Sequence, residues 1–332
     1  MTNRPSTVKI SFRVKVIGGF RQVLEIFAKE DGKFIRTENI ELGSWINMHD
    51  PTGAEIDLVS SVLGVERDII TTVLDEEERA HIEDYGDVKL IVVDIPEACP
   101  PEDVSPYNTF PLGIILAKDK LLTVSLKALP VLKPFLEGKV KNFSINKRMR
   151  FILQILLYNS SLYLQNLRSL NKMSGEIEKQ MRISMRNHEL FEMLRIEKSL
   201  VYFSTSLKAN DIVLEKLLKM DILQKYTEDD ELLEDVLIEN KQAIEMCSIY
   251  REVMGVIMDT FASMISNNLN IVMKVLTSVT LVMSVITMIS GLWGMNVPVP
   301  FQEHPYGFLI MGLGSLVLSI ISAFFLWKKK MF

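Results

Sequence analysis

The first 130 or so residues alternate between short apolar runs and polar breaks. Runs of strand length, such as VKLIVVDI at 88–95 and LGIILAKDKLLTVSL at 112–126, are typical of β-strands, and Lys-Asp-Lys divides the second into a hairpin. The stretch from Asp50 to Gly64 carries the start and stop signals of a helix. Five prolines at 96–111 predict a loop between two strands. These patterns predict an α/β domain with hairpins over residues 1–137.

A second pattern starts after Pro134, because no further proline occurs before Pro298 and apolar residues recur at helical spacing. It predicts a nearly continuous helical stretch, with a helical hairpin region over 138–227 and a stalk helix over 228–270. The stalk pattern continues without a break into an uncharged stretch, so the two together form one helix on the order of 95 Å long.

Two stretches without a charged residue follow, at 275–302 and 307–327. At a rise of about 1.5 Å per residue, each is long enough for a helix that crosses a hydrocarbon layer roughly 30 Å thick. The sequence therefore predicts a first transmembrane helix at 271–293, an external loop at 294–306, a second transmembrane helix at 307–327 and a basic tail at 328–332.

Charges at the ends of the spans predict the orientation. Lys274 directly precedes the uncharged stretch of the first span, Lys328, Lys329 and Lys330 follow the second span, and the loop between the spans has neither Lys nor Arg. Because positive flanks stay on the cytoplasmic side, we expect a multi-pass protein of the cell membrane with both termini in the cytosol. The start, MTNRPSTVKISFRVK, has no apolar signal-peptide core, so roughly the first 270 residues are expected to stay in the cytosol.

Composition agrees with this division. Hydrophobic residues make up 48% and charged residues 24% of the chain, and the mean hydropathy is +0.19, which favours a large soluble part joined to a small membrane part. Cys99 and Cys247 lie far apart without metal-ligand spacing, which favours a reducing compartment and no disulfide or zinc framework. No ATP-binding motif is visible. We expect neither enzymatic activity nor a nucleic-acid partner.

One face of the first predicted span is mildly polar throughout its depth. Small and hydroxyl residues recur there at spacings of three and four: Thr277, Thr280, Ser284, Thr287 and Gly291. Met273 and Asn270 extend the same face toward the cytosol. Such residues either let helices pack closely or line a pore, and the pattern does not decide between the two. One striped helix cannot enclose a channel, so a pore would need several copies of the chain. Hydroxyls would suit hydrated magnesium, because they hydrogen-bond to its water shell without removing it.

Acidic residues gather in two regions, at 75–87 and at 228–235. Such charge runs are usually solvated faces. Divalent-cation binding is the other interpretation, because carboxylate oxygens are ligands that magnesium prefers.

The tripeptide Gly294-Met295-Asn296, at the outer end of the first of two carboxyl-terminal spans, resembles the signature of the CorA family of magnesium transporters. Its context makes the resemblance specific: SNNLNIVMKVLT at 266–277 opens the span, a second span follows directly, and WKKKMF ends the chain. The resemblance is specific over about the last 80 residues, and the head and stalk match the family's architecture. It implies an α+β membrane protein whose stalk is continuous with its first span, assembled as a funnel-shaped homopentamer.

The resemblance also implies roles for individual residues. Asn296 would form an outer ring that selects hydrated magnesium, and Gly294 and Met295 would shape that ring. The pore below would be lined by Gly291, Thr287, Ser284 and Thr280, with a constriction at Leu276 and Met273 and with Asn270 at the cytosolic mouth. Regulatory magnesium would bind between subunits at Asp259 and Asp235, together with Asp75 or Glu76 of the head.

The sequence departs from the family pattern at three places. Trp293 stands where the family commonly has Tyr before the tripeptide, and VPVPFQEH at 297–304 replaces an acidic Met-Pro-Glu loop. Glu303 is the only acid in that loop. Ser284 occupies a position where methionine is frequent, which changes the expected profile of the pore.

These observations predict a channel for passive magnesium influx that is gated by cytoplasmic magnesium, so that Mg²⁺ is both cargo and regulator. A divalent ion gains roughly 4.6 kcal/mol per 100 mV of inside-negative potential, so no coupled energy source is needed. A zinc, cobalt or nickel transporter of the same superfamily is the nearest alternative, although the stripe contains neither Cys nor His. A membrane-tethered coiled-coil sensor is the alternative from another class, but it leaves the second span without an evident purpose.

Overall fold

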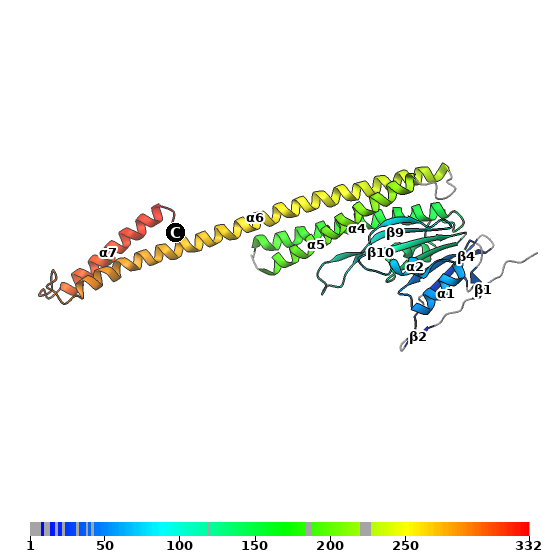
Figure 1. Cartoon of the computed structure of the whole chain (residues 1–332). Helices are drawn as coiled ribbons and strands as arrows, with labels where there is room; N and C mark the ends of the chain where they lie inside the picture. Colours follow the sequence, from blue (N-terminus) through cyan, green and yellow to red (C-terminus); the bar gives the residue numbers. More distant parts are fainter. Residues whose placement is uncertain are drawn as a thin grey trace, which may run out of the picture. The chain divides into compact units, whose positions relative to one another are not determined.

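The computed structural model describes residues 8–9, 14–16, 19–21, 24–30, 33–37, 39–40, 43–118, 120–183, 187–219 and 227–331. The chain forms two compact units, Met1–Met254 and Gly255–Phe332. Figure 1 shows a sheet with helices in the first unit, and a long helix, α6 (Thr227–Trp293), whose last part belongs with α7 (Gly307–Lys328) to the second unit. The boundary between the units falls inside the stalk that the sequence predicts at 228–270.

A mixed β-sheet organises the first unit. Within the described residues, seven strands follow the order β5-β4-β7-β11-β10-β9-β8, and only β7 and β11 pair in parallel. Their bounds are β4 Leu24–Glu30, β5 Lys33–Thr37, β7 Trp45–His49, β8 His81–Asp84, β9 Val88–Ala98, β10 Tyr107–Ala117 and β11 Lys120–Ser125. Two further pairs are β1 Val8–Lys9 with β6 Asn39–Ile40 and β2 Val14–Val16 with β3 Gly19–Arg21. The hairpin predicted at 112–126 is confirmed as β10 and β11, while Asp119 in its turn lies outside the described residues.

Both faces of this sheet are buried, which explains the continuous apolar runs of its central strands. Along β9, Ile91, Val93 and Ile95 face one hydrophobic core, whereas Leu90 and Val92 face the other. The second core is covered by α1 and α2, and the first by η1, α3, α4 (Arg148–Ile183) and α5 (Asn187–Lys219). The bounds of the short helices are α1 Gly53–Leu63, α2 Arg67–Thr72, η1 Pro130–Leu132 and α3 Lys133–Leu136. The predicted α/β domain is therefore a sheet between two helical layers.

Helix α1 has the caps that the sequence signals. The Thr52 hydroxyl accepts a hydrogen bond from the backbone N–H of Glu55 at 3.4 Å, and the Glu55 carboxylate accepts one from the backbone N–H of Thr52 at 2.8 Å. This capping box satisfies backbone donors that the first turn leaves unpaired. Gly64 ends the helix at φ 67°, a left-handed conformation that glycine adopts without steric cost. The predicted capped helix is confirmed.

The proline-rich stretch at 96–111 is only partly the loop that the sequence predicts. Pro96 lies inside β9 and Pro111 inside β10, each paired with the other strand. On the opposite side, β8 pairs only as far as Val92 and β11 begins its pairing at Leu112. Both prolines therefore lie just past the end of the neighbouring strand, where the missing backbone N–H costs no ladder hydrogen bond.

A buried polar node joins β9 to the long helices α4 and α5. The backbone carbonyl of Asp94 accepts hydrogen bonds from Asn159 at 2.9 Å, Tyr163 at 3.1 Å and Asn210 at 2.9 Å. Asn210 also accepts the backbone N–H of Asp94 at 2.9 Å. Because one backbone position holds three side chains from two helices, the node fixes the placement of these helices on the sheet.

Long helices make up the rest of the chain: α4 Arg148–Ile183, α5 Asn187–Lys219, α6 Thr227–Trp293 and α7 Gly307–Lys328. The nearly continuous helix predicted after Pro134 is wrong over 137–147, which is irregular because Val140, Phe143 and Ile145 turn toward the first core. An ion pair between Arg150 and Asp229, 3.0 Å apart, joins the start of α4 to the start of α6. Both cysteines are free, Cys99 half-buried and Cys247 buried.

Candidate functional site

The second unit exposes far more apolar surface than a soluble domain does. Helices α6 and α7 each contain a stretch that is long and apolar enough to span a membrane, yet only 6% of that stretch in α6 and 11% in α7 is buried. The core helix of a soluble protein would be mostly buried. The bare apolar faces of both helices therefore require lipid or other protein chains around them.

Helix α7 packs on one face of α6 through small residues. The hydroxyl of Ser278 donates to the carbonyl of Met331 at 3.2 Å, and the hydroxyl of Ser319 donates to the carbonyl of Val282 at 3.5 Å. Ser315 and Ser319, four residues apart on α7, are both buried, and small side chains of this kind let two helices approach closely. Within 271–293, the buried and half-buried positions of α6 all lie on this face, which we call the α7 seam: Ser278, Val282, Val285, Ile286, Ile289 and Trp293.

The polar stripe lies on the face of α6 opposite the α7 seam. At about 3.6 residues per turn, Thr280, Ser284, Thr287 and Gly291 are roughly half a turn away from the seam positions. All four are exposed, and the implied constriction and mouth residues Leu276, Met273 and Asn270 are exposed as well. Close packing against α7 is therefore carried by other residues, and the stripe is available to water or to another chain.

The hydroxyls of the stripe donate their protons to carbonyls of α6 itself. Thr280 bonds to Leu276 at 2.8 Å, Ser284 bonds to Thr280 at 2.8 Å, and Thr287 bonds to Met283 at 3.1 Å. A hydroxyl that has given its proton to the backbone still has acceptor lone pairs. The stripe thus presents hydrogen-bond acceptors, without charge, along the exposed face.

The tripeptide Gly294-Met295-Asn296 follows directly on the last turn of α6. The N–H of Gly294 donates to the carbonyl of Ser290 at 3.0 Å, and a side chain at Gly294 would place its Cβ only 3.3 Å from that carbonyl oxygen. Asn296 is exposed, and its side chain bonds to none of the residues that the structure describes. Its amide therefore does not cap α6, and both its donor and its acceptor atoms are available to an external group.

The carboxylates implied for regulation are all exposed. Asp235 and Asp259 lie on α6, and Asp75 and Glu76 lie in the turn after α2, where Asp75 accepts the N–H of Glu77 at 3.0 Å. Across the described ranges, no group of three or more His, Cys, Asp or Glu side chains is arranged to hold a metal ion. Their oxygens suit a hard cation in chemical type, but one chain does not assemble a complete set of ligands.

Asp235 has basic neighbours. It borders a shallow hollow of about 330 Å³ whose lining also includes Lys141, Arg150 and Glu231. Arg150 is already paired with Asp229 at 3.0 Å. Positive side chains oppose cation binding, so Lys141 weakens the case for a cation at Asp235 within one chain.

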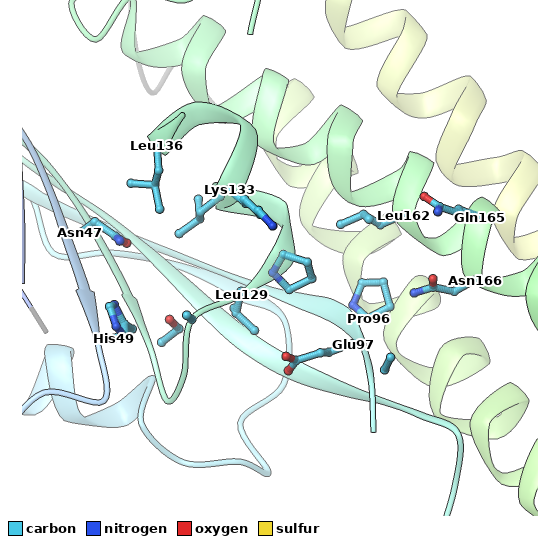
Figure 2. A pocket seen from close by; sticks show the side chains of 15 residues that line it. Asn47, His49, Pro96, Glu97, Leu129, Lys133, Leu136, Leu162, Gln165 and Asn166 are labelled. Carbon is cyan, nitrogen blue, oxygen red and sulfur yellow. The ribbon is translucent and has the colours of Figure 1, made fainter. Parts of the chain in front are cut away.

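A larger cavity of about 490 Å³ lies in the first unit, between the sheet and helices α3 and α4. Figure 2 shows the polar side chains around it: Asn47, His49, Glu97, Lys133, Gln165 and Asn166. The Glu97 carboxylate is paired with Lys127, 2.5 Å away. None of the residues that the sequence implies for ion binding lines this cavity. No local sequence pattern predicts this cavity, because its walls come from strands and helices that are far apart in the chain.

Comparisons with known proteins agree on one family. The family described as CorA-like Mg²⁺ transporter protein matches residues 43–329. The cobalt/magnesium transport protein CorA of Methanocaldococcus jannaschii is 31% identical over 283 residues, which cover 83% of this chain and 87% of that protein. The protein of the same name from Thermotoga maritima is 24% identical over 344 aligned positions, 94% of each chain.

A solved structure, the complete CorA magnesium transporter from Methanocaldococcus jannaschii, is similar over most of the chain. It has a TM-score of 0.79 at 26% identity and covers 92% of this chain and 97% of that chain. The α/β head, the long helix and the final apolar helix are thus features that the two proteins share.

Proposed function

The chain belongs to the CorA-like Mg²⁺ transporter family and is a divalent-cation transporter, and we propose that it is a channel for passive Mg²⁺ influx across the cell membrane. The inside-negative potential drives the ion, at roughly 4.6 kcal/mol per 100 mV for a divalent charge. The names of the relatives include cobalt, so Co²⁺ is the second candidate cargo.

The observation that carries this proposal is the exposed acceptor stripe of α6, opposite the α7 seam. Waters bound to Mg²⁺ are strong hydrogen-bond donors, and Mg²⁺ loses them reluctantly. Thr280, Ser284 and Thr287 have their protons committed to the backbone, so they accept from such waters without competing for the metal. A neutral, weakly binding wall lets a hydrated ion pass.

A single helix encloses nothing, so the proposal includes a funnel-shaped homopentamer in which five copies of the stripe surround one path. The bare apolar surface of α6 supports assembly, because α7 covers only one of its faces. Gly294 and Met295 shape the outer mouth, where five Asn296 amides meet the hydration shell of the ion. Leu276 and Met273 form an apolar constriction that conducts only when wetted, and Asn270 lies at the cytosolic mouth.

Cytoplasmic Mg²⁺ closes the channel in this proposal. Ions that bridge carboxylates of adjacent subunits, Asp259 and Asp235 with Asp75 or Glu76, stabilise a symmetric closed state. When the ions leave, the carboxylates repel one another and the constriction opens. Binding between two subunits is supported by the state of these carboxylates in one chain, where they are exposed and form no complete set of metal ligands among the described residues.

The proposed orientation places both termini in the cytosol. Lys274 and Lys328–Lys330 flank the two spans at one end, while the 294–306 loop at the other end has no Lys or Arg. This asymmetry follows the rule that positive flanks stay inside. The tripeptide then faces the outside, where Mg²⁺ first meets the channel.

Flux into proteoliposomes tests the proposal. We expect the purified protein to admit Mg²⁺ to a trapped indicator when a potassium diffusion potential makes the interior negative, with external Co²⁺, Ni²⁺ and Zn²⁺ added in turn as competitors. Asn296→Ala is expected to abolish Mg²⁺ uptake while the oligomer still assembles. The matched control is Asn267→Ala, an exposed asparagine of α6 that lies off the stripe.

Three results would contradict the proposal. Uptake of Zn²⁺ in preference to Mg²⁺ would make the protein a zinc transporter. Absence of any divalent flux would favour an anchored sensor. Near-normal Mg²⁺ uptake by a correctly assembled Asn296→Ala protein would remove Asn296 from the selective ring.

A further inference from the structure

The loop between α6 and α7 is closed by a hydrogen bond across it. Trp293, the last residue of α6, donates its indole N–H to the backbone carbonyl of Pro300 at 3.2 Å. This bond separates the segment 294–299, which carries the tripeptide, from the segment 301–306, which leads into α7. The 294–299 segment is therefore fixed at both ends, by α6 and by the indole.

Gly307, the first residue of α7, closes the loop from the other side. A Cβ at Gly307 would lie 2.3 Å from the carbonyl oxygen of Phe301 and 3.5 Å from Cζ2 of Trp293, so no larger residue fits without moving the loop. Phe301 itself has φ 65°, a left-handed conformation that residues other than glycine rarely adopt. Such a conformation persists only where surrounding contacts hold it.

Asn296 depends on this closure for its position. Its side chain bonds to none of the described residues, so nothing but the backbone of 294–299 determines where its amide lies. Resting on the proposed function, we propose that Trp293 is a positioning residue: its bond to Pro300, with Gly307 behind it, holds Asn296 toward the ion path. The indole acts through the backbone and does not touch the ion.

The proposal predicts a specific change in transport. Asn296 accepts hydrogen bonds from the water shell of the ion, and a hydrogen bond of this kind is lost when the acceptor moves by about 1 Å. Without the indole bond, fewer loop conformations present the amide correctly, so Mg²⁺ binds the outer mouth more weakly. The width of the path below does not change, so the maximum rate of uptake is retained.

Trp293→Phe is the decisive variant, because it removes the indole N–H and keeps an aromatic ring. We expect the external Mg²⁺ concentration for half-maximal uptake to rise about fivefold, the effect expected from losing one neutral hydrogen bond, with assembly and maximum rate retained. The matched control is Trp327→Phe in α7, since the Trp327 indole donates to no residue of the described part of the chain. A half-maximal concentration equal to that of the wild type would overturn the proposal.

Hydrogen–deuterium exchange of the full-length protein in detergent tests the closure without relying on transport. Trp293→Phe and Gly307→Ala should both accelerate exchange in 294–306, whereas Trp327→Phe and Gly312→Ala should not, because a Cβ at Gly312 meets open space. Unchanged exchange in both loop variants would overturn the proposal even if the wild type moved no ion. A wild type without Mg²⁺ flux that still shows the accelerated exchange would reject the proposed function and leave the closure standing.

Discussion

Ser278 donates a hydrogen bond to the backbone carbonyl of Met331, 3.2 Å away, and so ties the segment that directly follows α7 to α6. Ser278 is fully buried, although it belongs to the same run of small and hydroxyl residues as the exposed stripe. Spacing separates the two roles, because residues on opposite faces of one helix meet different partners. Because α7 covers the seam, the stripe faces the surroundings on the opposite side of α6.

Two matched substitutions should separate these roles. Ser278→Leu adds volume to the closed seam and should destabilise the α6–α7 pair by roughly 1–3 kcal/mol. Thr287→Leu, on the exposed face, should leave that stability unchanged and lower Mg²⁺ uptake at least tenfold, because an apolar side chain replaces an acceptor along the proposed path. Unfolding in mixed detergent and flux in proteoliposomes measure the two effects. If both variants lost only stability, the stripe would be another packing face.

The oligomeric state is a prediction of its own. The exposed apolar surface of α6 and the need for several stripes around one path both favour a homopentamer. Native mass spectrometry of the protein released from mild detergent should give five chains. A monomer or dimer that still transports Mg²⁺ after reconstitution would contradict this arrangement.

Asp259 should contribute to closure and not to permeation. Asp259→Ala removes an exposed carboxylate of α6, so we expect about tenfold more internal Mg²⁺ to be needed for half-inhibition, a change of roughly 1.4 kcal/mol, with the order of ion preference intact. Glu252→Ala, an exposed acid on the same helix, is the control. The double variant with Asp235→Ala tests redundancy. Unchanged inhibition in that double variant would reject both residues as regulatory ligands.

Local signals account for most of the fold that the sequence predicts. Thr52 and Gly64 mark the ends of α1, because capping acts within a few residues. The uncharged runs mark the candidate spans, because the length of an apolar run is itself the signal. The sequence predicts a loop for Pro96 and Pro111 because nothing in their local sequence indicates where a neighbouring strand stops pairing. That information exists only once the sheet has formed.

The candidate site shows the same limit. Helical spacing reveals the stripe, but it does not tell which face α7 covers, because the choice depends on Ser315 and Ser319 in another helix. The bond from Trp293 to Pro300 joins two ends of an irregular loop, where no periodic pattern gives a signal. Within the described part of one chain, Asp259 and Asp75 belong to no group of three or more possible metal ligands. Their proposed role therefore rests on the resemblance and on assembly.

Asp94 gives the first unit a pH dependence that can be measured. Burial raises the pKa of its carboxyl from 3.8 to about 6, with Ser206 opposing the shift through a hydrogen bond and Glu78 adding to it. Above pH 6 the folded protein holds a buried charge, whereas below about pH 4 the group is neutral in both the folded and the unfolded state. The stabilising contribution of the proton is thus complete below pH 4 and is lost as the pH rises through 6.

Asp94→Asn should remove this loss. At about 1.4 kcal/mol per pH unit, the variant should be more stable than the wild type by up to about 3 kcal/mol at pH 7.5, and the difference should shrink toward pH 4. Denaturant unfolding of the full-length protein in detergent, carried out in parallel for both proteins at each pH, measures the difference directly. Asp87→Asn, at an exposed position between β8 and β9, is the matched control. A difference that stays constant with pH would mean that the Asp94 carboxyl does not titrate in this range, and the node at β9 would then tolerate a charge that its burial should disfavour.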